Sequence, residues 1–132
     1  MTQQHQLMGI LVVEDDAALR INILNYLICA GYTVKGVCSA IEFYREFLMA
    51  PYAISIIDTD LYDQEGLVVA EYARKNTDMG IITLSEPLSS STVPSSFNSG
   101  ADFNLFKPVQ LRQLLSCVGT LFSRFDAVHE SM

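Results

Sequence analysis

Apolar residues along this chain follow two alternating spacings. Short β-branched runs predict strands, because a strand buried on both faces needs apolar residues at consecutive positions. The five runs are Gly9 to Val13, Tyr32 to Val37, Ala53 to Ile57, Gly80 to Leu84 and Asp102 to Phe106. Strands that alternate with helices favour right-handed crossovers and a parallel sheet covered on both faces. The predicted class is therefore α/β.

Between these runs, apolar residues recur every three or four positions, which predicts amphipathic helices. The helical segments are Leu19 to Ile28, Phe43 to Leu48, Leu67 to Ala73 and Leu111 to Phe122. Gly31 is placed to end the first helix, and Ser39 with Glu42 forms a capping box at the start of the second. The run at 32–37 alternates between polar and apolar residues, which predicts an edge strand.

Residues 85–99 interrupt the pattern where a fourth crossover helix would stand. This segment holds seven serines and two prolines, and both residue types disfavour a helix interior. We therefore predict that the fourth helix is irregular or short. The segment is then a surface loop or a region that becomes ordered on a partner.

Length and composition fit one cytoplasmic domain. The chain has 132 residues, of which 50% are hydrophobic and 17% charged, enough apolar material for a core. Its start lacks the features of a signal peptide, and no apolar run is long enough to span a membrane. We expect a flexible tail at 1–8, the domain at 9–125, and a tail or the start of a linker at 126–132. The three cysteines lack C-x-x-C spacing and are expected to be buried thiols.

The chain is also acidic, with 15 Asp and Glu against 8 Lys and Arg and a net charge of -7. An acidic surface repels nucleic acids and anionic membranes, so this domain is expected to bind neither directly. Residues 14–16 and 58–65 together hold seven of the acids. The excess charge is therefore concentrated in two loops, and such a concentration favours a cation site.

Polar residues follow four of the predicted strands at the point where each strand ends. They are Glu14, Asp15, Asp58, Ser85 and Lys107. Because the carboxyl ends of parallel strands meet at one edge of the sheet, we expect these side chains to converge. Three clustered carboxylates repel one another unless a hard cation such as Mg2+ lies among them. Together with one lysine, that cation would neutralise the pocket.

This set of side chains suits phosphoryl transfer. An aspartate carboxylate is a competent nucleophile towards phosphorus, and the reaction is catalysed mainly by positioning and by cations on the phosphoryl oxygens. Asp58 would attack, Mg2+ and Lys107 would stabilise the transferring group, and the Ser85 hydroxyl would donate to a third oxygen.

The chain resembles the receiver domain of bacterial two-component response regulators. The resemblance rests on four motifs in order: Ile-Leu-Val-Val-Glu-Asp-Asp at 10–16, Asp58 followed by Leu61 and Gly66, the hydroxyl of Ser85, and Gly100-Ala101-Asp102 leading to Lys107-Pro108. It implies a flavodoxin-like sheet with strand order 2-1-3-4-5. It also implies a cis peptide bond between Lys107 and Pro108.

The resemblance further implies a role for each site residue. Asp58 would accept a phosphoryl group from a sensor histidine kinase, and Ser85 and Lys107 would hold it. Asp15 and Asp58 would bind Mg2+ directly, Glu14 through water, and Asp60 through its backbone carbonyl. The domain would act as a signalling switch and not as an enzyme. It would stand at the N-terminus of a transcription regulator that reaches DNA through a downstream domain, with homodimer formation left open.

Several positions depart from the family pattern. Glu86 places an anion beside Ser85, Asn104 replaces the usual aromatic residue, and Tyr62 replaces a common proline. A pseudo-receiver that binds partners without phosphorylation therefore stays an alternative. Asp58-Thr59-Asp60 also resembles the D-x-D motif of haloacid-dehalogenase-type phosphatases, a weaker alternative.

The acids also have purely structural interpretations. An acidic group at the start of the first helix is favoured by the helix dipole, and Asp16 suits its N-cap.

Phe106 lies on the same strand face as Asn104 and is a candidate substitute for the missing aromatic residue.

Overall fold

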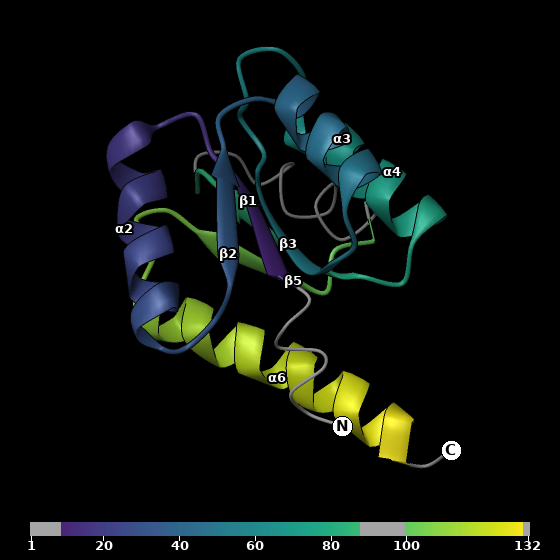
Figure 1. The fold of residues 1–132 in the computed structure, drawn as a ribbon. Coiled ribbons are helices and arrows are strands. Elements are labelled where there is room, and N and C mark those ends of the chain that lie inside the picture. Colours follow the sequence, from purple (N-terminus) through teal and green to yellow (C-terminus); the bar gives the residue numbers. More distant parts are fainter. Residues whose placement is uncertain (1–8, 88–99, 131–132) are drawn as a thin grey trace.

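The computed structural model describes residues 9–87 and 100–130 (Figure 1). The elements are β1 (Gly9–Val13), α2 (Ala17–Cys29), β2 (Val34–Val37), α3 (Ala40–Met49), β3 (Tyr52–Asp58), α4 (Gly66–Asn76), β4 (Gly80–Ser85), β5 (Phe103–Phe106) and α6 (Leu111–Glu130). Neighbouring strands are parallel, in the order β2-β1-β3-β4-β5. This confirms the predicted flavodoxin-like, doubly wound sheet, with β2 at an edge.

Helices cover both faces of this sheet, α2 and α6 on one side and α3 and α4 on the other (Figure 1). Alternate residues of β1 serve the two cores. Ile10 and Val12 pack beneath α2 and α6, whereas Leu11 and Val13 pack beneath α3 and α4. All four side chains are 0% exposed, which explains why the central strands are continuously apolar.

Several predicted boundaries differ from the structure. The second strand begins at Val34 and not at Tyr32. The last helix continues to Glu130, well beyond its predicted end at Phe122, because residues 123–130 contain neither Gly nor Pro to stop it. The irregular fourth helix was predicted in a segment of which residues 88–99 lie outside the described part of the chain. No helix in the described ranges is long and apolar enough to cross a membrane.

The predicted helix caps are present. The Asp16 carboxylate accepts the N–H groups of Ala18 and Leu19 at the start of α2. The Ser39 hydroxyl accepts the N–H of Glu42 at 3.2 Å. The Glu42 carboxylate accepts from Cys38, one residue before the position that a standard capping box uses.

The prediction for the cysteines is only partly correct. Cys117 is buried and Cys38 is half-buried, but Cys29 is exposed. Cys29 is the last residue of α2, and it follows the exposed Ile28 instead of facing the core. Helical spacing indicates a buried face, but it does not fix where that face ends at a helix terminus.

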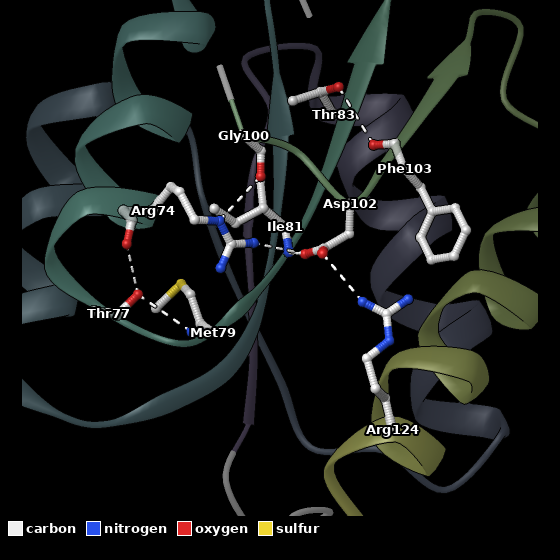
Figure 2. A network of polar contacts seen from close by, with 10 residues as sticks. Arg74, Thr77, Met79, Ile81, Thr83, Gly100, Asp102, Phe103 and Arg124 are labelled. Carbon is white, nitrogen blue, oxygen red and sulfur yellow. Dashed lines mark hydrogen bonds and ion pairs between the residues drawn. The ribbon is translucent and has the colours of Figure 1, made fainter. Parts of the chain in front are cut away.

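Asp102 ties the start of β5 to two helices (Figure 2). Its Oδ2 atom accepts the Ile81 N–H at 2.8 Å and Arg74 Nη2 at 2.7 Å, and its Oδ1 accepts Arg124 Nη1 at 3.2 Å. Arg74 also donates to the carbonyl of Gly100, where a side chain would collide with the arginine stem and φ is +89°. This network accounts for Gly100 and Asp102 in the sequence before β5.

Asp63 connects the loop after β3 to the start of α3. Its two carboxylate oxygens accept the N–H groups of Ala40 and Ile41 at 3.0 and 3.1 Å. Desolvation alone would raise the pKa of Asp63, but these N–H donors outweigh it and lower the pKa below its usual value. One of the acids counted towards the cation site therefore caps a helix from 23 residues away.

We predict that Asp63→Ala lowers the free energy of unfolding by about 1 kcal/mol at pH 7, the usual value of a helix cap. Because the folded-state pKa of Asp63 is lowered, its stabilisation is complete above the unfolded pKa of about 3.9 and disappears as pH falls through the folded value. Urea unfolding between pH 7 and pH 3 measures this. Asp60→Ala, an exposed acid of the same loop, is the control. An equal loss in both variants would contradict the cap.

Candidate functional site

The carboxyl ends of four strands bring the predicted side chains to one edge of the sheet. Glu14 and Asp15 follow β1, Asp58 ends β3, Ser85 ends β4, and Lys107 follows β5. Backbone pairing continues beyond the strands, because the Lys107 N–H donates to the Ser85 carbonyl at 2.8 Å. The sheet register therefore fixes the backbone positions from which these side chains extend.

Three carboxylates and one ammonium group form the centre of the site. Glu14, Asp15 and Asp58 each offer an oxygen atom, and these oxygens lie within 4.8 Å of one another. Lys107 Nζ lies 3.3 Å from Glu14 Oε1 and 3.3 Å from Asp58 Oδ1. Glu14 and Asp58 are 0% and 1% exposed, whereas Asp15 faces solvent. The ion pairs are thus largely removed from water.

Burial and mutual repulsion shift the protonation of this cluster. Burial raises the pKa of Glu14 to about 8, and the neighbouring Asp58 adds to the rise. The pKa of Asp15 is raised as well, first by desolvation and then by the charge of Asp58. Burial would lower the pKa of Lys107, but the Asp58 and Glu14 carboxylates outweigh it and raise the value. Full ionisation of all three carboxylates is therefore unfavourable with one lysine as the counter-charge.

The cluster suits a hard cation. Asp58 Oδ1 accepts the Asp60 N–H at 3.0 Å and contacts Lys107. Asp58 Oδ2 is buried and has no hydrogen-bond partner within residues 9–87 and 100–130. A buried carboxylate oxygen without a partner is costly, and a divalent ion with oxygen ligands would satisfy it. The donor set consists of oxygens, as Mg2+ requires, so the residues fit the expected ion.

Gly66 allows α4 to begin directly against Asp58. A Cβ atom at position 66 would overlap the carbonyl oxygen of Asp58 and crowd Thr59. The Gly66 N–H also donates to the Thr59 carbonyl at 3.0 Å. The glycine eight residues after Asp58 therefore determines how closely the helix approaches the backbone of the central aspartate.

Ser85 is at the expected position, but its hydroxyl is engaged elsewhere. Ser85 is 0% exposed, and its Oγ donates to Asn104 Oδ1 at 2.8 Å. The expected cis bond between Lys107 and Pro108 is present. The structure thus brings Glu14, Asp15, Asp58 and Lys107 together. The Ser85 hydroxyl instead points to Asn104 on the neighbouring strand β5.

Sequence reasoning missed two contributors. Arg20, on the second turn of α2, donates from Nη1 to the Glu14 carbonyl at 2.6 Å and so fixes the loop after β1. Thr83, a polar residue inside an apolar strand, donates to Asn104 Oδ1 at 2.7 Å. A threonine at a fully buried strand position was a usable signal, because buried hydroxyls need partners. Nothing in the sequence distinguished Arg20 from a surface arginine.

Comparison with known proteins agrees with this geometry. Residues 10–119 match the response regulator receiver domain family. The chain belongs to this family. It is 26% identical to the TorCAD operon transcriptional regulatory protein TorR of Escherichia coli O157:H7, over 92% of this chain and 53% of that protein. It is 29% identical to the transcriptional regulatory protein GltR of Pseudomonas aeruginosa, over 88% and 49%. This receiver domain spans about half the length of these curated relatives.

Solved receiver domains share the fold. A CheY-like receiver domain protein from Methanospirillum hungatei superposes with a TM-score of 0.84 at 27% identity, covering 92% of this chain and 98% of that one. The receiver domain of the Francisella response regulator 1452 gives a TM-score of 0.83 at 24% identity, covering 89% and 98%. At that lower identity the likeness concerns the fold alone.

We predict that Gly66→Ala disrupts the site through the backbone. The added methyl group must push α4 away from Asp58, and such overpacking costs about 1–3 kcal/mol. Urea unfolding measures this loss, and isothermal titration with Mg2+ should show weaker binding. Gly119→Ala is the matched control, because a Cβ there meets no atom within 4 Å and alanine favours a helix. Unchanged stability and Mg2+ affinity in Gly66→Ala would contradict this assignment.

Proposed function

We propose that this receiver domain is a cytoplasmic phosphorelay switch whose phosphoacceptor is Asp58. The observation that carries the proposal is the buried Asp58 carboxylate, which has Lys107 on Oδ1 and an unpartnered Oδ2. Oδ1 is held by the Asp60 N–H and by Lys107, so the orientation of the attacking carboxylate is fixed. A nucleophile held in place beside a fixed cation suits a reaction that depends mainly on positioning.

The phosphoryl donor is a phosphohistidine of a sensor histidine kinase. The P–N bond of the donor breaks while a bond forms between an Asp58 carboxylate oxygen and phosphorus, and the imidazole leaves with the electron pair. Lys107 stabilises the charge on the transferring oxygens, and the Ser85 hydroxyl donates to one of them. Asp15, Asp58, the Asp60 carbonyl and, through water, Glu14 would hold Mg2+, which would supply the remaining positive charge when bound. The product is stoichiometric phosphoaspartate, so the domain acts as a switch and not as a turnover enzyme.

For the output, we propose a transcription regulator of which residues 9–125 are the N-terminal receiver. TorR and GltR are named transcriptional regulatory proteins, and the chain matches about half of each. The chain carries a net charge of -7, and an acidic surface repels the phosphate backbone of DNA. DNA contact would then belong to a downstream domain, and a homodimer, if formed, would present two copies of it.

A second candidate is a pseudo-receiver that works without phosphorylation. It is favoured by the Ser85 hydroxyl, which is bound to Asn104, and by Glu86, which is exposed directly after it. Both features oppose a phosphoryl group at the site. The experiment below separates the two candidates.

We predict that acetyl phosphate with Mg2+ adds one phosphoryl group to the protein, and that chelation of Mg2+ or Asp58→Asn abolishes the addition. The reason is that Asp58 supplies the attacking oxygen and the cation balances the charge. Intact-protein mass spectrometry measures it. The matched control is Asp78→Asn, an exposed acid at the opposite end of the sheet before β4, which should react like the wild type. A wild-type protein that remains unmodified, and that binds no beryllofluoride in the presence of Mg2+, would favour the pseudo-receiver.

A further inference from the structure

Three polar side chains on β4 and β5 form a hydrogen-bonded cluster beside the site. Thr83 and Ser85 are both 0% exposed, and they lie two residues apart on the same face of β4. Asn104 stands opposite Thr83 in the β4–β5 register. The cluster thus lies within the sheet, on β5 and on β4, the neighbour of β3, which ends at Asp58.

One oxygen atom connects the three residues. Asn104 Oδ1 accepts Thr83 Oγ1 at 2.7 Å and Ser85 Oγ at 2.8 Å. Both distances are typical of good hydrogen bonds from a hydroxyl. A carbonyl oxygen has two lone pairs, so these two donors fill it.

The Ser85 hydroxyl cannot serve two acceptors. A serine hydroxyl carries one proton and therefore donates one hydrogen bond at a time. In the structure that proton goes to Asn104. A phosphoryl oxygen on Asp58 would need the same proton, since Ser85 is the hydroxyl that ends the strand beside Asp58.

We propose that Asn104 is a positioning residue that competes with the phosphoryl group on Asp58 for the Ser85 proton. Phosphorylation then requires the Ser85 hydroxyl to rotate away from Asn104, and Asn104 Oδ1 keeps only the bond from Thr83. The proposal rests on the phosphorylation of Asp58 described above. It assigns to an amide the place on β5 where the family pattern has an aromatic ring.

This exchange carries the state of Asp58 to the surface of the domain. β5 is the edge strand next to β4, and Phe106, which pairs with Ser85 and shares the face of Asn104, is 41% exposed. A change at Asn104 Oδ1 is therefore two residues along β5 from a solvent-exposed aromatic side chain. A partner that binds the exposed end of β5 would respond to the loss of the hydrogen bond between Ser85 and the Asn104 amide.

The first test concerns the unphosphorylated protein and does not depend on Asp58 chemistry. Ser85→Ala should lower Tm by about 3–5 °C in the wild type, because it removes one hydrogen bond from Asn104. In an Asn104→Leu background the same change should either raise Tm or lower it by no more than about 1 °C. The reason is that the hydrogen bond to Asn104 is already absent there. Asn104→Ala is the second background if the leucine variant does not fold. Equal shifts in both backgrounds would overturn the proposal.

The second test measures the affinity for beryllofluoride, a phosphoryl mimic, in the presence of Mg2+. Asn104→Leu should bind it about three to ten times more tightly than the wild type, which corresponds to one hydrogen bond that no longer has to be broken. The gain should vanish when Ser85→Ala is also present. Thr83→Val is the matched control, because it removes the other donor and leaves the Ser85 bond in place, and it should bind no more tightly than the wild type.

The outcomes separate the two proposals. Tighter binding by Asn104→Leu that depends on Ser85 supports the competition, including the case in which the wild type binds too weakly to measure. Equal binding by the wild type and Asn104→Leu overturns the competition but leaves Asp58 phosphorylation intact, as does equal tightening by Thr83→Val. If no variant binds beryllofluoride with Mg2+, the phosphorylation of Asp58 and the competition both fail.

Discussion

The Lys107 ammonium, 3.3 Å from both the Glu14 and Asp58 carboxylates, is the interaction on which the site depends. Its partners come from β1 and β3, which are neighbours, while Lys107 follows β5, two strands beyond β3. Its long side chain must therefore reach back across the carboxyl end of β4. Removing the Lys107 ammonium would leave two buried carboxylates side by side, a state that proteins avoid by protonating one of them. The charge balance of the site therefore depends on the strand order, because that order places Lys107 within reach of Glu14 and Asp58.

Two of the remaining acids of the two loops serve the fold. The sequence places seven acids in residues 14–16 and 58–65, and charge arithmetic alone would assign them all to one cation site. The structure divides them. Asp16 and Asp63 accept backbone N–H groups at the starts of α2 and α3, whereas Glu14, Asp15 and Asp58 form the cluster. The caps hold the loops in the shape that keeps the three clustered acids together.

Sequence reasoning succeeded where a property depends on position along a strand. Apolar runs located every described strand, and the residues that end those strands had to meet because parallel strands share one edge. It failed where a property depends on contacts between distant segments. Asp63 lies 23 residues from the helix it caps, so local spacing could not link them. The direction of the Ser85 hydroxyl depends on an acceptor on another strand, and the sequence contained Asn104 but not its side-chain conformation.

Under the proposed competition for the Ser85 proton, an amide at position 104 instead of an aromatic ring would change how much signal the sheet carries. An aromatic side chain transmits a change through packing, whereas an amide does so through hydrogen bonds that are either made or broken. One such bond is worth about 1 kcal/mol, which shifts a two-state equilibrium about fivefold. That shift is small beside the roughly 10⁴-fold preference needed to move an equilibrium from 1:99 to 99:1. If two copies change together, their free energies add and the shift becomes about 25-fold. A switch built on this bond therefore gains most from association, either with a second copy or with a partner that reads β5.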